Sequence, residues 1–555
     1  MIFSNTEKKK REKIMLNTTF KRLLKPILVI LAILILTLSV SAGDLFGTYD
    51  KRIKLTIDHT KIDADLSWFP VTVFLTSSQG AEVFTEFDAD EDFDRIAFTT
   101  SDGETQLYAD CELFDVSERK AIYHVSKTGW TVSSSTDTDI YLYYDNTAGH
   151  NTTYISKSGG TAAQSVWDSN FEAVYHMADG IDIGSPATNR SNHAGRTQTY
   201  INKDNPADKG GVIKKIEVWY NSTPIFDAIV ATFYRPDPTN YPNHFTARDS
   251  YNIGKPTAGS KQIIDVDLVV EAGDYIGVYS GGGDYGNIEV DTSGGSDIWF
   301  LTGDYTDCTN EEFSVASGWA MSLGSFAYTI IDATSNANHG TKKGVNEPAE
   351  ATGKVGQGQD FDGTDDDITL WEYNGGDTSF TFECIFNADS WGVNNYGRLL
   401  SARDGGGGAF DFYIDGNTGN ECLQLVYYGD SDNGISTDAD SIDLSTWYYI
   451  TSVLNSVDNH VAYINGSSAG TNTTDNIGTD INACSIPIKI GNRTSDDNRE
   501  FDGIIDEVRI SSTARSAAWI AATYDSLWDT LLTYGAEETA PPASDTNVLF
   551  IFSNF

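Results

Sequence analysis

Acidic residues that follow a repeated motif form the part of the sequence with the clearest chemical potential. The tripeptide Phe-Asp-Gly occurs at residues 361–363 and again at 501–503, and acidic residues follow each copy. A Ca²⁺ ion takes about six to eight oxygen ligands, including backbone carbonyls, and tolerates loop geometry. The candidate calcium ligands are Asp332, Gly363, Asp365, Asp366 and Asp506. The open alternative is that these acids only solvate the chain and cap turns.

A second group of candidates consists of aromatic and charged residues between positions 391 and 428. Sugars are recognised by aromatic platforms together with a few polar groups that converge on one site. The candidate ligand-binding residues are Trp391, Tyr396, Arg398, Asp404 and Tyr428. Each of these aromatic side chains could instead belong to a hydrophobic core.

The elements that must position these residues are predicted to be strands. Val, Ile, Tyr, Phe and Thr alternate with polar residues along nearly the whole chain, and 50 glycines are available for turns. This pattern favours short strands joined by turns. Because 555 residues are too many for one core, we expect three folded domains in an all-β chain. One short helix is expected over residues 515–525, with Ser516 as its N-cap.

The first 42 residues are typical of a segment that directs export. A basic flank precedes an apolar run at residues 27–36, and small residues end the segment at Val40 and Ala42. This order predicts a signal peptide over residues 1–42. An uncleaved membrane anchor is the alternative, although the run is shorter than the roughly 20 apolar residues that span a bilayer. We therefore expect an extracellular or cell-surface protein that touches a membrane only through this segment, if it is not cleaved.

The net charge limits the possible partners, and the cysteine content limits the possible metal sites and disulfides. The formal net charge of −43 excludes nucleic acid as a partner, because a phosphate backbone requires basic residues for neutralisation. The five cysteines show no Cys-x-x-Cys spacing, so they indicate neither a zinc site nor a dense disulfide framework. Export would permit a bridge between Cys384 and Cys422, while buried thiols are the default.

The first strand-rich segment resembles a known family. The stretches "YDKRIKLTIDHTKIDADLSWFPVTVFLT", "FTTSDG" and "IYLYYDN" resemble a prokaryotic surface-protein domain of unknown function that usually precedes a laminin-G-like jelly roll. The resemblance covers nearly all of residues 43–164. It implies an extracellular β-sandwich and no particular chemistry.

The remaining chain resembles a laminin-G-like domain of the concanavalin A-like lectin/glucanase superfamily. The resemblance rests on "SVWDSNFEAVYHMAD" in residues 165–180 and on "FDGTDD", "YINGS" and "IDEVRIS" in residues 331–536. Residues 181–330 separate these parts and have strand periodicity of their own, which predicts an inserted β-sandwich module. Residues 537–555 are expected to be a linker and a short tail. The predicted fold is therefore all-β, with several β-sandwiches and a C-terminal jelly roll that the module interrupts.

The laminin-G-like resemblance also implies how the acidic residues meet. In that architecture the strands that follow the two Phe-Asp-Gly motifs would lie side by side, which brings Asp332 near Asp506. Phe361 and Phe501 would then be core anchors. A structural Ca²⁺ ion is the cofactor that this arrangement predicts.

The function expected from these features is binding without catalysis. An exported surface protein would bind a glycan or a partner protein through the jelly roll, in adhesion or envelope structure. A purely structural module without a sugar ligand is one alternative. A glycoside hydrolase is the other, because Glu86 and Glu91 in "EFDADE" have the spacing of laminarinase-type enzymes, in which two carboxylates act about 5 Å apart. This motif lies outside the jelly roll, so we assign no catalytic residue.

Overall fold

The computed structural model describes residues 45–540 except for residues 179, 195–196, 208, 222–223, 225, 281–286, 326–328, 343–346, 405–406, 418, 485 and 494–498. Strands make up 48% of the chain and helices 7%, which confirms the all-β prediction. The predicted export segment and residues 541–555 lie outside the described residues. Among the residues that are described, no helix is both long enough and apolar enough to cross a membrane.

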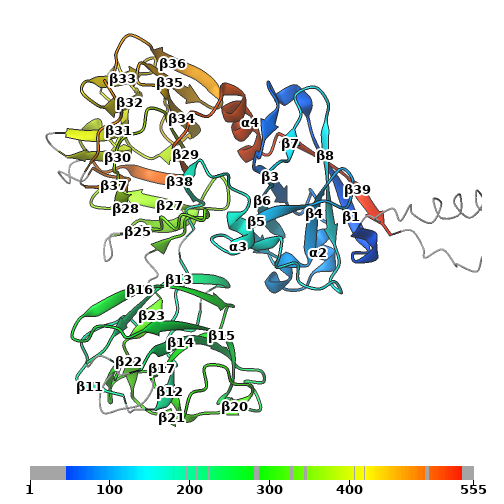
Figure 1. Cartoon of the computed structure of the whole chain (residues 1–555), viewed down its shortest axis with the longest axis vertical. Coiled ribbons are helices and arrows are strands. Elements are labelled where there is room, and N and C mark those ends of the chain that lie inside the picture. The colour runs from blue at the N-terminus through cyan, green and yellow to red at the C-terminus, as the bar shows by residue number, and fades with distance from the viewer. Residues whose placement is uncertain are drawn as a thin grey trace, which may run out of the picture.

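The first domain is built on one eight-stranded sheet (Figure 1). The order of the strands is β3-β6-β5-β4-β8-β1-β39, and β9 pairs with β5 in parallel. These strands are β1 (Lys51–Ile57), β3 (Val71–Leu75), β4 (Ile96–Thr100), β5 (Gln106–Asp115), β6 (Lys120–Ser126), β8 (Thr138–Tyr144), β9 (Ile155–Lys157) and β39 (Leu532–Thr539). The smaller elements are η1 (Leu45–Gly47), η2 (His59–Lys61), β2 (Leu66–Ser67), α2 (Val83–Glu86), η3 (Asp90–Asp94), β7 (Thr131–Val132) and α3 (Thr161–Gln164).

The last strand of the described chain differs from its expected place. Residues up to 536 were expected to belong to the jelly roll, but β39 pairs antiparallel with β1 of the first domain, with Leu55 opposite Tyr534. In Figure 1 the red β39 lies beside the blue β1. The side chains of an edge strand alternate between the two faces of whichever sheet the strand joins. Alternation in the sequence therefore does not identify the partner strand. The first domain is therefore completed by the C-terminal end of the described chain.

Residues between β10 and β24 form a separate β-rich module. It contains a seven-stranded sheet, β20-β15-β14-β17-β12-β19-β21, and two three-stranded sheets, β16-β13-β23 and β11-β18-β22. The strands are β11 (Asn192–His193), β12 (Gln198–Asn202), β13 (Gly211–Trp219), β14 (Ala228–Tyr234), β15 (His244–Gly254), β16 (Lys261–Val270), β17 (Tyr275–Ser280), β18 (Glu289–Asp291), β19 (Ile298–Thr302), β20 (Glu311–Glu312), β21 (Ser314–Ala316), β22 (Ala320–Met321) and β23 (Leu323–Ser325). One core cluster joins Ile216 and Leu268 of the smaller β16-β13-β23 sheet to Val230 and Val278 of the larger.

The jelly roll consists of two eight-stranded sheets that enclose one core. The first sheet has the order β26-β27-β38-β29-β34-β35-β36, with β10 paired to β38, and the second has the order β24-β25-β28-β37-β30-β31-β32-β33. The strands of the first sheet are β10 (Phe171–Tyr175), β26 (Ala349–Thr352), β27 (Gln357–Asp362), β29 (Phe380–Ala388), β34 (Trp447–Ser456), β35 (Asn459–Ile464), β36 (Ser467–Asn472) and β38 (Asp502–Ser511). Those of the second are β24 (Thr329–Ile330), β25 (Gly340–Lys342), β28 (Ile368–Glu372), β30 (Arg398–Asp404), β31 (Gly407–Asp415), β32 (Cys422–Tyr428), β33 (Asp432–Ser436) and β37 (Pro487–Ile490), with η4 (Val393–Asn395) before β30.

Two distant pieces of chain are joined within this jelly roll. β10 precedes the separate module in sequence, yet it pairs antiparallel with β38, where Val174 lies opposite Arg509. The chain enters and leaves the module at neighbouring points, because the Gly180 amide donates to the Thr329 carbonyl at 2.8 Å.

The two Phe-Asp-Gly motifs meet more directly than predicted. β27 carries the first motif and pairs with β38, so that Phe361 lies opposite Gly503. The rings of Phe361 and Phe501 are both buried, with centroids 6.2 Å apart, as expected for core anchors. The expectation for the following strands is wrong, because β28 belongs to the other sheet.

Helix α4 (Ala517–Leu527) lies between the jelly roll and the first domain (Figure 1). As predicted, Ser516 caps it and accepts from the Trp519 amide. The Trp519 ring packs edge-on against Phe69 of the first domain at 5.0 Å, whereas the Tyr524 ring stacks on Tyr449 of the jelly roll. All five cysteines are buried, and Cys384 and Cys422 are free thiols.

Candidate functional site

The predicted ligand-binding residues gather around β30, β31 and β32 of the second jelly-roll sheet. Along β31, Phe410 and Phe412 point into the core, so the alternating residues Asp411 and Tyr413 lie on the opposite face of the sheet. Tyr413 pairs across the strands with Arg398. A patch of aromatic and charged residues therefore covers the outer face at this point.

Arg398 holds this patch together and is itself enclosed. Its side chain is buried and donates to both carboxylate oxygens of Asp411, at 3.0 and 2.8 Å. Its third donor group binds the Tyr396 carbonyl at 2.8 Å, and its guanidinium lies 4.0 Å from the centre of the Tyr413 ring. Because these contacts engage its guanidinium, Arg398 holds Asp411 and the Tyr396 backbone in place, and its contact with a ligand stays a prediction.

Tyr396 and Tyr428 are half-buried rings beside this patch, and their contact with a ligand stays a prediction. The guanidinium of Arg499 lies 5.2 Å from the Tyr396 ring, and that of Arg403 lies 4.9 Å from the Tyr428 ring. Burial and the nearby Asp411 raise the pKa of Tyr428 to about 12, so its hydroxyl is a hydrogen-bond donor at neutral pH.

The two other predicted residues have different outcomes. Trp391 packs against the jelly-roll core and covers Gly416, where a Cβ atom would lie 2.0 Å from the indole Cγ. It is therefore a packing residue. Asp404 ends β30, and its side chain lies outside the described residues.

Sequence reasoning missed Asp411, Tyr413 and Arg403. The alternation in "GAFDFYID" places Asp411 and Tyr413 opposite the core phenylalanines, and this signal was available in the sequence. Arg403 follows an irregular register between β30 and β31, so its position could not be derived from alternation.

The predicted calcium ligands do not all lie in one group in the structure. Carboxylate oxygens of Asp362, Asp365 and Asp366 lie within 4.8 Å of one another in the turn after β27. Gly363 lies in the same turn, with a φ of 68°. Burial, together with the carboxylates of Asp362 and Asp365, raises the pKa of Asp366 to about 6, although the Asp362 amide donates to it. This acidic group has the donor atoms for a metal ion.

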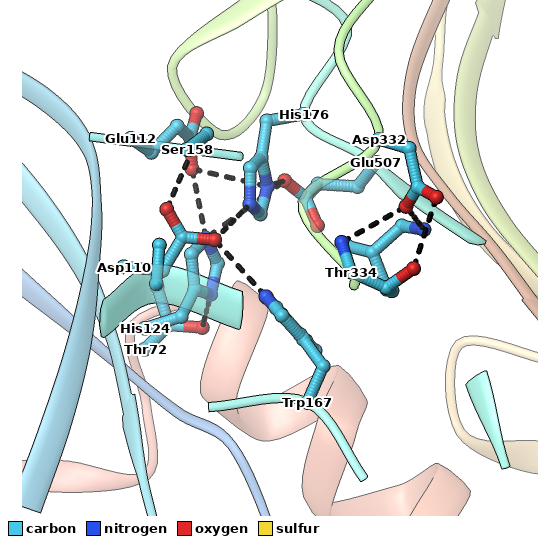
Figure 2. A network of polar contacts seen from close by, with 12 residues as sticks. Thr72, Asp110, Glu112, His124, Ser158, Trp167, His176, Asp332, Thr334 and Glu507 are labelled. Atoms are coloured by element: carbon cyan, nitrogen blue, oxygen red, sulfur yellow. Dashed lines mark hydrogen bonds and ion pairs between the residues drawn. The ribbon is translucent and has the colours of Figure 1, made fainter. Parts of the chain in front are cut away.

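Asp332 and Asp506 are not part of this group. Asp332 caps its own turn and accepts hydrogen bonds from the Val174, Thr334 and Asn338 amides at 2.9 to 3.0 Å (Figure 2). Asp506 is fully buried and accepts from the Val355 amide. The structure therefore gives each of these two carboxylates backbone amide partners of its own, and neither belongs to the acidic group of Asp362, Asp365 and Asp366.

A third polar group, not foreseen from the sequence, lies where the first domain meets the jelly roll (Figure 2). It contains Glu112 on β5, His124 on β6, His176 directly after β10, and Glu507 on β38. Their ligand-type atoms all lie within 4.8 Å of one another, and all four side chains are at most 4% exposed.

Comparisons with known proteins agree with the fold of the C-terminal region. The family model for the concanavalin A-like lectin/glucanases superfamily matches residues 362–521. No curated protein matches the sequence.

Solved structures with a similar fold include two binding domains and one domain of an arabinanase. The binding domain of Paraclostridial Mosquitocidal Protein 1 is 15% identical, with a TM-score of 0.29, and the match covers 36% of this chain and 49% of that one. The botulinum neurotoxin serotype G binding domain is 15% identical, with a TM-score of 0.28 and coverages of 35% and 48%. Domain 4 of AbnA, a GH43 extracellular arabinanase from Geobacillus stearothermophilus, in complex with arabinotriose, is 18% identical, with a TM-score of 0.28 and coverages of 34% and 90%.

These similarities concern part of each molecule. The chain spans about half the length of the first toxin binding domains that it matches. The family match and the two facing sheets together identify the C-terminal region as a concanavalin A-like jelly roll.

Proposed function

We propose that this chain is an exported surface protein whose jelly roll binds a glycan or a glycosylated partner without catalysis. The observation that carries the proposal is the patch on the outer face of β30–β32. Three half-buried tyrosine rings, Tyr396, Tyr413 and Tyr428, lie there with a guanidinium against each ring. Oriented aromatic rings with nearby polar groups are the usual means of binding sugars. The match of the C-terminal region to the lectin/glucanase family model agrees with this proposal.

The proposed location is the cell surface or the extracellular space. The signal-like segment at residues 1–42 and the strongly acidic composition support it. Mass spectrometry of the exported product would identify the mature N-terminus and decide between cleavage and anchoring.

The patch can be tested with a glycan array followed by calorimetry on the best ligand. Tyr428→Ala removes one ring of the patch, and we expect at least about a fivefold loss of affinity, since a stacking ring contributes about 1 kcal/mol or more. Tyr251→Ala is the matched control, because Tyr251 is 37% exposed on the separate module. A Tyr428→Ala variant with unchanged affinity would place the binding site elsewhere.

The two alternatives predict different outcomes in the same experiments. A purely structural module would bind no sugar on the array. A glycosidase would release reducing sugar, and Glu86→Gln together with Glu91→Gln would abolish the release. Glu86 is engaged by Lys51 at 2.5 Å and by the Asn146 amide, and it lies in the first domain, so its environment favours a structural role.

We also propose that the acidic turn of Asp362, Asp365 and Asp366 binds Ca²⁺. Its ligand atoms are all oxygens, as Ca²⁺ prefers. Added Ca²⁺ is then expected to raise the midpoint of thermal unfolding of the wild type and to have little effect on Asp366→Asn. An equal effect on both proteins would contradict this assignment.

A further inference from the structure

We propose that Glu112, His124, His176 and Glu507 bind a divalent transition-metal ion of the zinc class, which fastens the first domain to the jelly roll. Two ligands come from the first domain and two from jelly-roll strands or their immediate continuation. The site is independent of the sugar-binding patch and of the acidic turn. Its ligands are separated in sequence by up to several hundred residues, so only the folded chain assembles it.

Local irregularities aim the two carboxylates into the site. On β5, Glu112 is the extra residue of a bulge, because Cys111 pairs with Tyr123 and Leu113 pairs with Ile122. Bulges often redirect a side chain next to a functional site.

A similar irregularity surrounds Glu507. Ile385 on β29 pairs with Asp506, and Glu383 pairs with Arg509, so two residues of β38 lie opposite one of β29. Glu507 also adopts a φ of 45°, and Met177, directly after His176, adopts 58°. Left-handed backbone in residues other than glycine is unfavourable and tends to persist at functional sites.

The distances between ligand atoms suit a small ion. Glu112 Oε2 lies 2.9 Å from His124 Nε2 and 3.7 Å from His176 Nδ1. Glu507 Oε1 lies 2.5 Å from His176 Nδ1 and 3.9 Å from His124 Nε2. These distances fall on both sides of the roughly 3.3 Å that separates ligand atoms around a tetrahedral ion bound at about 2.0 Å. Small side-chain movements would place all four atoms around one ion.

The second nitrogen of each imidazole is already held by a partner. His176 Nε2 contacts Asp110 Oδ2 at 3.1 Å, and His124 Nδ1 contacts the Thr72 hydroxyl at 3.1 Å (Figure 2). Asp110 is in turn fixed by the Trp167 indole N–H and the Ser158 hydroxyl. Metal-bound histidines in proteins usually donate their other N–H to such a partner, which fixes the tautomer and the ring.

Two observations favour an ion over a network of ion pairs alone. Glu112 Oε1 is buried and has no hydrogen-bond partner among the described residues. The rings of His124 and His176 stack with centroids 4.4 Å apart and an angle of 9° between their planes. This stacking sets His124 Nε2 and His176 Nδ1 beside the same two carboxylates, Glu112 and Glu507.

The ligand types identify the class of metal. Two imidazole nitrogens and two carboxylate oxygens suit Zn²⁺ and related divalent ions, whereas Ca²⁺ and Mg²⁺ prefer oxygen ligands alone. Because all four side chains are buried, the expected role is structural.

The first test uses the wild-type full chain stripped with a chelator and reloaded with Zn²⁺ or Co²⁺. Elemental mass spectrometry is expected to find one ion per chain bound at this site. The Co²⁺ form is expected to show the visible absorption of tetrahedral Co²⁺. The proton spectrum of the Co²⁺ form is expected to show two strongly shifted imidazole N–H signals, one for each histidine. Zn²⁺ should raise the midpoint of thermal unfolding, because it binds only the folded chain.

The second test compares variants of the ligands with variants of the other candidate groups. Glu112→Gln and His176→Gln are expected to weaken Zn²⁺ binding by at least about 100-fold, and Asp110→Asn, next to His176, by about 10-fold to 100-fold. Asp366→Asn in the acidic turn and His59→Gln in the exposed group of Asp58, His59 and Asp137 are the controls. Both controls should retain the site and its Co²⁺ spectrum.

Two results would overturn the proposal. One is a stripped wild-type chain that takes up no ion or shows no shifted imidazole signals with Co²⁺. The other is a folded Glu112→Gln or His176→Gln variant that binds as tightly as the wild type. Either result would leave the four residues as an ion-pair network, and the wild-type spectra decide the question even if the variants do not fold.

Discussion

At the scale of single residues, the structure separates side chains that bind from side chains that hold others in place. Arg398 looked like a ligand-binding residue in the sequence, yet Asp411 and the Tyr396 carbonyl occupy its guanidinium. A buried arginine whose guanidinium groups all donate to neighbouring groups is a positioning residue. Contact between a ligand and the tyrosine rings around it stays a prediction.

The Arg398–Asp411 pair gives a direct prediction for stability. Asp411→Ala would leave the guanidinium buried without its carboxylate, so we expect a loss of about 3–5 kcal/mol in the free energy of unfolding. Chemical denaturation measures it. Asp139→Ala is the control, because Asp139 and Lys54 form a pair with side chains 33% and 41% exposed, for which a loss of about 1 kcal/mol or less is expected. If Asp411→Ala lost no more free energy of unfolding than Asp139→Ala, Arg398 would have found another partner in the variant.

Sequence reasoning reached some of these residues and not others. Phe361 and Phe501 were predictable as core anchors because an apolar residue before Asp-Gly can turn into the core. Tyr413 was predictable from strand alternation and was overlooked. The group of Glu112, His124, His176 and Glu507 was not predictable, because two bulges aim its carboxylates and no local pattern marks a bulge.

At the scale of elements, the strands of the jelly roll bury polar side chains that titrate. His460 on β35 is fully buried, with Nε2 3.0 Å from the Ser452 hydroxyl and its ring against Tyr427. Burial lowers the pKa of His460 from 6.5 to about 3. The folded jelly roll therefore holds this imidazole in its neutral form.

This histidine makes stability depend on pH. The unfolded chain binds a proton near pH 6.5 and the folded chain does not, so stability is full above pH 6.5 and falls as the pH is lowered toward 3. We expect a loss of up to about 1.4 kcal/mol per pH unit from this residue. Unfolding curves between pH 7 and pH 4 should be flatter for His460→Gln than for the wild type. His193→Gln, at an exposed position, should keep the wild-type slope, and equal slopes in all three proteins would contradict the assignment.

The elements themselves were largely predictable, but their partners were not. The short helix and its Ser516 cap follow from residue types and spacing. The laminin-G-like resemblance predicts that residues up to 536 belong to the jelly roll, whereas β39 pairs with the edge strand β1 of the first domain. Sequence alternation describes a strand's own faces and carries no information on which distant edge it joins.

At the scale of the whole molecule, strands near the two ends of the described chain pair with each other. β39 near the C-terminal end completes the sheet that β1 begins, and α4 packs between the two domains that it connects. The four residues of the proposed metal site, Glu112, His124, His176 and Glu507, lie where the same two domains meet (Figure 2). The first domain and the jelly roll are therefore expected to unfold together, while the separate module has its own core.

This pairing predicts the effect of shortening the chain. A chain that ends at Leu531 lacks β39, so β1 becomes an exposed edge, and the Phe74 amide loses the Tyr534 hydroxyl that it now contacts at 3.1 Å. With several backbone hydrogen bonds lost at roughly 1 kcal/mol each, the free energy of unfolding should fall by at least about 3 kcal/mol. A chain that ends at Ala540 keeps the strand and is the control for the change in length. Thermal unfolding of both proteins measures the difference, and equal midpoints would mean that β39 adds nothing to the stability of the first domain.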